Sequence, residues 1–137
     1  IATLLPKAQI AARKAMIAAK ALGGGLTVQI LSGTRTYAEQ DKLFTQRPKV
    51  TNAKAGQSNH NFGIAFDVGI FKGKTYYTGK NAVENKAYLD LSKLIKPTGL
   101  EWGGDWKSIK DAPHYQLPTG KTVAQIRALL EAGKPYV

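Results

Sequence analysis

The helix and strand signals of this chain follow one another in an irregular order, and this order limits the folds open to it. Capping patterns, in which a polar side chain accepts a hydrogen bond from a backbone amide three residues on, mark helix starts at Thr36, Asn81 and Thr122. Pro6 favours the first turn of an earlier helix, which the glycines at 23–25 end. These signals predict helices at residues 6–22, 36–46, 81–96 and 122–133.

Strand candidates fall singly or in pairs between these helices. Residues 63–70 alternate, with Asp67 on one side and large apolar side chains on the other, namely Ile64, Phe66, Val68 and Ile70. Shorter candidates lie at residues 26–31, 75–77, 100–103 and 114–117. Because strands and helices do not alternate regularly, we expect a small α+β fold, with a mainly antiparallel sheet and flanking helices, rather than a doubly wound one. The mostly alanine face of the first helix favours packing on that sheet over lying on a membrane.

Length and charge narrow the classes of protein further. The 137 residues suit one domain, residues 1–137, with a substantial buried core. No run of about 18 apolar residues is present, so we expect no transmembrane segment. The formal net charge of +11 predicts attraction to polyanions such as the acidic polymers of a bacterial envelope. No dense basic run with interleaved aromatics is present, which argues against specific nucleic-acid binding.

The chain has two histidines, His60 and His114, and no cysteine, so a metal site would have to use nitrogen and oxygen ligands. Asp67 follows His60 closely, and Gly63 between them eases the turn needed for both to reach one ion. Two imidazoles and one carboxylate are the three protein ligands of a catalytic zinc site with a position open for water. Taken singly, each residue has a simpler explanation as a surface histidine or an aspartate paired with a cation.

A hydrolase also needs a group that moves protons, and Asp111 is the carboxylate nearest in sequence to a candidate ligand. Glu101 and Asp105 are its competitors, because the turn between Asp111 and His114 decides which carboxylate faces the site. Arg35, at a strand-to-helix junction, is placed to bind a carboxylate or polarise a carbonyl. Two tryptophans, Trp102 and Trp106, are candidates for a cleft wall.

These motifs resemble those of the zinc peptidases that group D-Ala-D-Ala carboxypeptidases and dipeptidases with L-alanyl-D-glutamate endopeptidases, including phage endolysins. The family pattern Ser-x-His-x-x-Gly-x-Ala-x-Asp is matched in full, by Ser58, His60, Gly63, Ala65 and Asp67. An acidic residue shortly before a histidine, the second family element, is matched by Asp111 and His114. The segment 32–36 with Gln40 resembles the part that carries a substrate-positioning arginine, so the similarity covers roughly residues 26–117.

The resemblance implies one catalytic Zn2+ bound by His60, Asp67 and His114, with Asp111 as the catalytic acid and base. It implies a catalytic and substrate-binding role for Arg35, and we expect Gln40, Ser58 and Trp102 to contribute to substrate binding. The implied fold is the small α+β fold that these peptidases share with the hedgehog signalling domain. The implied substrate is the stem peptide of bacterial peptidoglycan, cut between L-Ala and D-Glu. We also expect the enzyme to be a monomer.

Three other functions are compatible with the same residues. A D-Ala-D-Ala carboxypeptidase is the nearest, and a non-catalytic module that binds the cell wall through its charge is another. Two histidines and a carboxylate also describe non-haem iron oxygenases, although these usually place the acid two residues after the first histidine. A phage lysin made in the host cytoplasm and acting on the wall fits best, with a secreted or periplasmic bacterial enzyme as the alternative.

Overall fold

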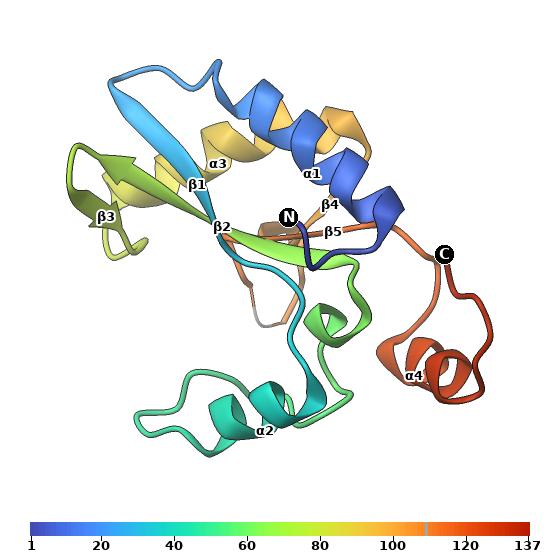
Figure 1. Cartoon of the computed structure of the whole chain (residues 1–137). Helices are drawn as coiled ribbons and strands as arrows, with labels where there is room; N and C mark the ends of the chain where they lie inside the picture. Colours follow the sequence, from blue (N-terminus) through green and yellow to red (C-terminus); the bar gives the residue numbers. More distant parts are fainter. Residues whose placement is uncertain (109) are drawn as a thin grey trace.

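A five-stranded antiparallel sheet organises the chain in a computed structural model that describes residues 1–108 and 110–137. The strand order is β1-β2-β5-β4, and β3 pairs with the C-terminal end of β2 (Figure 1). The strands are β1 (Leu26–Ser32), β2 (Ala65–Lys72), β3 (Thr75–Tyr77), β4 (Glu101–Trp102) and β5 (His114–Gln116). Each pairing between them is antiparallel, which confirms the predicted α+β class.

The described residues form four α-helices, at the predicted positions and with slightly shorter bounds. They are α1 (Pro6–Ala19), α2 (Tyr37–Thr45), α3 (Ala82–Ile95) and α4 (Val123–Glu131). Three 3-10 turns, which the sequence did not predict, are η1 (Asn59–Phe62), η2 (Lys96–Thr98) and η3 (Gly103–Asp105). The expected capping contacts are present, since Thr36, Asn81 and Thr122 each accept a hydrogen bond from the amide three residues on.

The two long helices, α1 and α3, cover one face of the sheet (Figure 1). The alanine face of α1 is buried there, as predicted for a helix that packs on a sheet. Small alanine side chains let α1 approach closely, and α3 fills the remaining space with larger groups such as Tyr88 and Leu91. The core side chains from the sheet are Phe66, Val68, Ile70, Trp102 and Tyr115.

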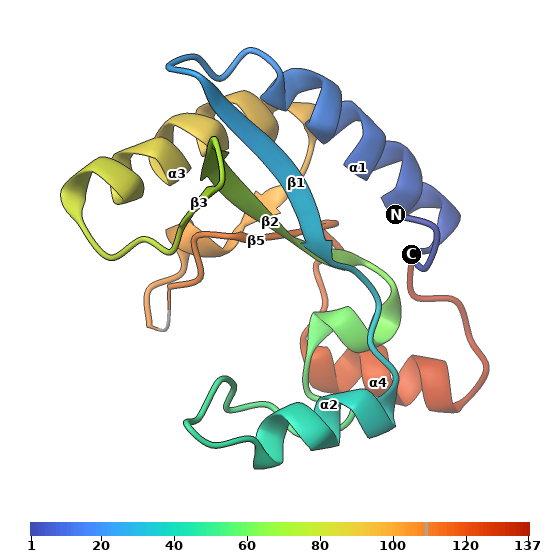
Figure 2. The ribbon, with the colours of Figure 1, turned by 60° about the vertical axis from the view of Figure 1, so that its left-hand side comes forward.

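A second, smaller cluster of buried side chains lies where η1 meets α4, near α2 (Figure 2). It contains Phe62, Ile64 and Ile126. The prediction that Ile64 shares a face with Phe66 is therefore wrong. The strand begins only at Ala65, because Gly63 adopts a left-handed conformation with φ of 71° that ends the extended run before it.

Gly63 lies against the start of the chain, and this close approach makes a testable prediction. A β-carbon at position 63 would lie 3.0 Å from Leu5 Cγ and 3.2 Å from the Leu5 backbone nitrogen. We expect Gly63→Ala to lose about 1–2 kcal/mol for the left-handed backbone and about 1–3 kcal/mol more for the overlap with Leu5. Urea unfolding with Gly73→Ala as the matched control separates the two costs, because Gly73 has φ of 60° and open space around it. Equal losses in both variants would show that the contact with Leu5 is unimportant.

Within the described ranges, 1–108 and 110–137, no helix combines the length and apolar character needed to cross a bilayer.

Candidate metal centre

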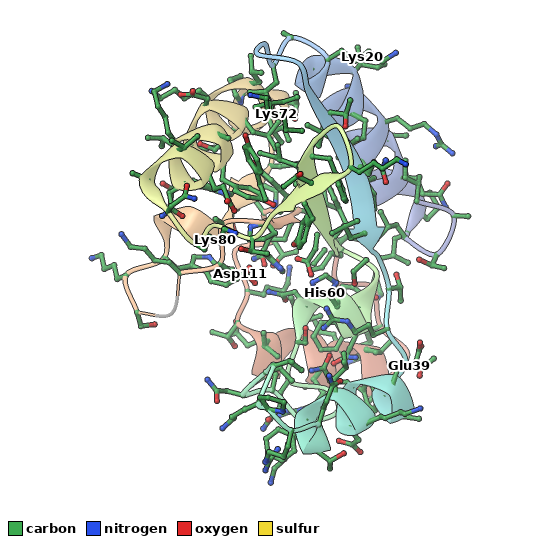
Figure 3. The ribbon with its side chains drawn as sticks, turned by 90° about the vertical axis from the view of Figure 1, so that its left-hand side faces the viewer. Lys20, Glu39, His60, Lys72, Lys80 and Asp111 are labelled. Atoms are coloured by element: carbon green, nitrogen blue, oxygen red, sulfur yellow. The ribbon has the colours of Figure 1, made fainter. Side chains whose placement is uncertain are left out.

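Three side chains from separate elements converge on the face of the sheet opposite α1 and α3. His60 comes from η1, Asp67 from β2 and His114 from β5, where it pairs directly across from Asp67. Asp67 Oδ1 lies 3.3 Å from His60 Nε2 and 3.3 Å from His114 Nδ1. One ligand atom from each residue lies within 4.8 Å of the others. Figure 3 shows His60 and Asp111 near the middle of the molecule, far from Lys20 and Lys72 at one end.

Each imidazole is oriented by the nitrogen that points away from Asp67. His60 Nδ1 lies 2.8 Å from the carbonyl oxygen of Gly33, and His114 Nε2 lies 2.7 Å from Gln116 Oε1. A carbonyl oxygen can only accept, so these outer nitrogens carry the hydrogens of the neutral rings. The inner nitrogens then present lone pairs toward the carboxylate.

The Asp67 oxygen that faces the two imidazoles, Oδ1, is buried and has no hydrogen-bond donor among the described residues, because Arg35 reaches only the other oxygen, Oδ2. A buried carboxylate oxygen facing two imidazole lone pairs is unfavourable unless protons or a metal ion stand between them. Zinc binds such donors at about 2.0–2.2 Å, which places tetrahedral ligand atoms about 3.3–3.6 Å apart. The two 3.3 Å separations at Asp67 fit that geometry.

Titration of the group also favours a positive charge beside Asp67. Burial alone would raise the pKa of Asp67, but the imidazoles of His114 and His60 beside it lower that pKa far below its usual range. Burial opposes the charged form of His114, yet its contacts with Asp67 and Gln116 raise its pKa. A metal ion would compete with protons for the same lone pairs. The lowered pKa of Asp67 and the raised pKa of His114 therefore both indicate that the site favours a bound cation.

Asp111 faces the same site, which settles the turn that the sequence left open. The Asp111 amide donates to the Gly103 carbonyl at 3.0 Å, and the His114 amide donates to the Asp111 carbonyl at 3.2 Å. These bonds fold the segment so that Asp111 Oδ2 lies 4.0 Å from His114 Nδ1. Burial and the negative charge of Asp67 raise the pKa of the Asp111 carboxyl, so it binds a proton more readily than an exposed aspartate does.

Arg35 reaches the centre from the loop that follows β1. A register shift between Ile30 and Ser32 places Ser32 opposite Asp67, and the Arg35 amide then bonds to the His60 carbonyl at 2.9 Å. The Arg35 guanidinium donates to Asp67 Oδ2 at 3.4 Å. Arg35 therefore lies beside the metal-binding group with part of its guanidinium open to the cavity.

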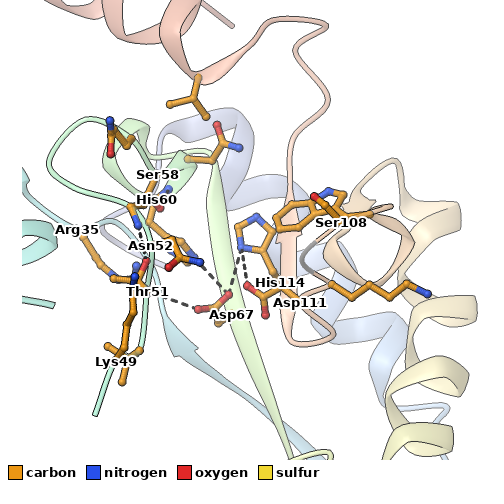
Figure 4. Close-up of a pocket in the computed structure, with 17 residues that line it drawn as sticks. Arg35, Lys49, Thr51, Asn52, Ser58, His60, Asp67, Ser108, Asp111 and His114 are labelled. Atoms are coloured by element: carbon orange, nitrogen blue, oxygen red, sulfur yellow. Dashed lines mark hydrogen bonds and ion pairs between the residues drawn. The ribbon is translucent and has the colours of Figure 1, made fainter. Parts of the chain in front are cut away.

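An open cavity of about 890 Å³ leads to these residues (Figure 4). One wall comes from the loop after α2, including Lys49, Thr51 and Asn52, and the other from the segment that carries Ser108 and Asp111. Its other described lining residues are Arg35, Val50, Ala53, Gln57, Ser58, Asn59, His60, Asp67, Trp106, Lys110, His114 and Val123. The long loop predicted after the second helix thus forms part of the cavity.

Two residues expected to bind substrate do not line this cavity. Gln40 is fully buried, where it donates to the Ala53 carbonyl at 2.8 Å and accepts from Arg35 at 3.1 Å. Trp102 is buried in the core and donates to the Ala112 carbonyl at 2.6 Å. The expectation that these two side chains touch the substrate is therefore corrected. Gln40 supports Arg35, and Trp102 supports the segment that leads to His114.

Of the other candidates, Ser58 lines the cavity, but its hydroxyl also caps η1 by accepting from the His60 amide at 3.2 Å. Glu101 and Asp105, the alternative proton carriers, do not line the cavity. Asp105 instead pairs with Lys96 at 2.6 Å, and Glu101 accepts from Gln116 at 3.2 Å.

Sequence reasoning missed two amides that build the site. Asn61 accepts from the amides of Gly56 and Ser58 and donates to the carbonyl of Arg35, so it joins the loop after α2 to the loop after β1. Gln116 holds His114. The usable signal for Gln116 was its spacing, because residues two apart on a strand share a face.

Trp106, and not Trp102, is the tryptophan of the cavity wall. Its ring centroid lies 4.9 Å from that of His114. Trp106 directly follows η3, which turns the chain away from the core after β4 and so separates the two tryptophans.

Comparison with known proteins agrees with this geometry. Residues 51–117, which include all three metal-binding candidates and Asp111, match the D-alanyl-D-alanine carboxypeptidase family. The peptidoglycan L-alanyl-D-glutamate endopeptidase CwlK of Bacillus subtilis (strain 168) is 38% identical over 110 residues, covering 72% of this chain and 65% of that protein. The L-alanyl-D-glutamate peptidase of Listeria phage A118 is 31% identical over 83 residues, covering 56% of this chain and 28% of that protein. The chain thus spans less than two thirds of either relative.

Among solved structures, the L-Ala D-Glu endopeptidase ChiX of Serratia marcescens shares the fold, with a TM-score of 0.65 and 22% identity. The match covers 86% of this chain and 83% of that one. Over residues 51–117 the chain is similar to the D-alanyl-D-alanine carboxypeptidase family, and over 110 residues it is similar to an L-alanyl-D-glutamate endopeptidase.

Proposed function

We propose that residues 1–137 form one catalytic domain, a zinc peptidase that hydrolyses the stem peptide of peptidoglycan between L-Ala and D-Glu. The observation that carries the proposal is the His60, Asp67 and His114 group at the base of an open cavity, with Asp111 beside it. The choice of bond rests on the two relatives named as L-alanyl-D-glutamate peptidases.

His60, Asp67 and His114 would hold the zinc ion, because their three donor atoms converge and the inner oxygen of Asp67 has no hydrogen-bond donor among the described residues. A zinc ion bound by three protein ligands supplies a Lewis acid that lowers the pKa of water from about 15.7 to about 7. The second nitrogens of the histidines, bound to Gly33 and Gln116, keep both rings aimed at that position.

Asp111 is suited to carry the proton of the reaction. In hydrolysis the water oxygen bonds to the peptide carbonyl carbon, and the bond from that carbon to the amide nitrogen breaks. Asp111 accepts a proton from the attacking water and delivers it to the leaving nitrogen. Arg35, on the other side of Asp67, is placed to donate to the carbonyl oxygen as that oxygen gains negative charge.

A digest of defined muropeptides tests the proposed bond. Zinc-loaded protein should leave L-Ala with a free carboxyl group on the glycan side and release a peptide that begins with D-Glu, both read by mass spectrometry. The family match to D-alanyl-D-alanine carboxypeptidases makes carboxypeptidase activity the second candidate, and free D-Ala from a pentapeptide stem would identify it. Zinc-loaded protein with no turnover on either substrate would exclude both activities.

The charges of the cavity suit an acidic peptide. Its described lining includes the cations Arg35, Lys49 and Lys110 against the carboxylates Asp67 and Asp111, and a zinc ion would add two further positive charges. Stem peptides carry free carboxylates next to the proposed bond. Weak attraction of this kind is screened by salt over about 8–10 Å at physiological ionic strength, so binding should weaken as salt is raised.

Lys49 provides a prediction about this attraction. We expect Lys49→Ala to raise KM by about two- to fivefold, the range of one exposed ion pair, and to leave kcat unchanged, because the contact is equal in the ground and transition states. Lys7→Ala is the matched control, since Lys7 is exposed on α1, away from the cavity. Steady-state kinetics at low salt measures both variants. An equal rise in KM for the two would assign the effect to net charge alone.

We further propose that the enzyme works as a monomer on the bacterial cell wall, as a phage endolysin made in the host cytoplasm. The similarity to a peptidase of Listeria phage A118 supports the phage source, and the similarity to CwlK supports the secreted bacterial alternative. Light scattering that gives the mass of two chains would contradict the monomer.

A further inference from the structure

The two histidines of the metal centre are oriented by acceptors of different kinds. His60 Nδ1 faces the backbone carbonyl of Gly33, which can only accept and therefore always selects the same tautomer. His114 Nε2 faces the side-chain amide of Gln116, at 2.7 Å from Oε1. An amide has a donor end and an acceptor end and can turn over, so Gln116 selects a tautomer only if something fixes its own orientation.

A carboxylate, Glu101, fixes the orientation of the Gln116 amide, and Asn59 makes a second contact that agrees with it. Gln116 Nε2 donates to Glu101 Oε2 at 3.2 Å, and Gln116 Oε1 accepts from Asn59 Nδ2 at 2.8 Å. Turning the amide over would set Oε1 against the carboxylate of Glu101 and the NH2 group against the NH2 group of Asn59. The contact with Glu101 would have to become repulsive, whereas Asn59 could turn over as well and remain an attractive partner.

The backbone pairing of the sheet places these groups side by side. His114 and Gln116 are two residues apart on β5 and so share a face. Glu101 on β4 pairs directly opposite Gln116, where side chains lie about 4.5–5.5 Å apart at their β-carbons. Asn59 approaches from η1, next to His60. The contacts from Glu101 through Gln116 to His114, which we call the relay, therefore link β4 to β5 beside the metal centre.

We propose that Gln116, held by Glu101, is a positioning residue that keeps the hydrogen of His114 on Nε2 and so makes Nδ1 the metal-binding nitrogen. Glu101 acts through Gln116 and does not touch the metal centre. The inference rests on the metal site of the proposed function, and it is independent of which bond the enzyme cuts.

The first test compares Gln116→Met with the wild type by two readouts other than activity. Chelator competition should show zinc binding about 10- to 100-fold weaker, the range for loss of a group that orients a metal-bound histidine. Nitrogen-15 NMR of the zinc-loaded protein, in which Asp67 no longer competes for the hydrogen of the ring, should show more than one state of His114. His60 should keep one tautomer, because its Gly33 acceptor is untouched, and it serves as the internal control.

A second pair of variants tests the role of Glu101. Glu101→Gln leaves the Gln116 amide free to turn over and should weaken zinc binding by about two- to fivefold, since the contact is exposed. The double variant Glu101→Gln with Gln116→Glu exchanges acceptor and donor between the strands. It should restore the single His114 tautomer and most of the zinc affinity. If Glu101 and Gln116 contributed only by packing, the double variant would not recover either property.

An unchanged His114 tautomer and unchanged zinc affinity in Gln116→Met would overturn the proposal, even if thermal unfolding showed lower stability. If Gln116→Met fails to fold, Glu101→Gln and the double variant decide by the same readouts. Failure of the proposed function is a separate result. Wild-type protein that binds zinc through a single His114 tautomer without cutting peptidoglycan would refute the function and leave the relay intact.

Discussion

His114→Ala should lose zinc and lower turnover of muropeptide at least about a thousandfold. The substitution removes one of three converging ligands and leaves Asp67 with a single imidazole partner. Electrostatic stabilisation by a catalytic metal is worth several kcal/mol, and each 1.4 kcal/mol is about a factor of ten in rate. His60→Ala should behave in the same way, because it removes the other imidazole.

Metal content and thermal unfolding check this prediction without reference to activity. Zinc at about 100 times its Kd should stabilise the wild type by about 2.7 kcal/mol, and the stabilisation should vanish in His114→Ala. Tyr136→Phe is the matched control, because the Tyr136 hydroxyl donates to the Phe62 carbonyl of η1 at 2.7 Å and so supports the same turn without facing the metal centre. Full turnover by metal-free His114→Ala protein would refute the site.

Asp111→Asn should keep zinc and lower kcat by about 10²- to 10⁴-fold, the contribution of a general acid and base. The amide preserves the shape of the side chain but cannot accept and return a proton. Asp111 is not one of the three converging ligand residues, so metal affinity should remain close to that of the wild type. Zinc analysis beside single-turnover kinetics separates the loss of chemistry from the loss of metal.

Asp105→Asn is the control for this variant. Asp105 was an equal candidate in the sequence, but it pairs with Lys96 and does not line the cavity. It should retain wild-type kcat and KM. If Asp111→Asn retained full bacteriolytic activity, the protein would act by binding the wall, and the catalytic proposal would be wrong.

Much of the fold was predictable because its signals are local. The capping contacts of Thr36, Asn81 and Thr122 involve residues three apart, and the alanine face of α1 repeats with the helical period. The exception is Ile64, where alternation continued through a glycine whose left-handed conformation had already ended the pattern. Alternation shows which residues can share a face, but the backbone dihedrals decide where a strand begins.

The choice among neighbouring candidates was beyond the sequence. Trp102 and Trp106 lie four residues apart, yet one is in the core and the other lines the cavity, because η3 turns the chain between them. Asp105 and Asp111 separate for a related reason, since the hydrogen bond from the Asp111 amide to the Gly103 carbonyl folds only Asp111 toward His114. Such turns depend on contacts with other parts of the chain.

By itself, the sequence determined the α+β class, the capped helices, the three candidate metal ligands and Asp111 as a candidate proton carrier, because periodicity, capping and short motifs involve residues close along the chain. Only the tertiary structure decided that Asp67 and His114 lie opposite each other, that Asp111 faces them, and that Gln116 orients His114. Those relations depend on strand register and on hydrogen bonds between distant segments, which no local pattern of residues specifies.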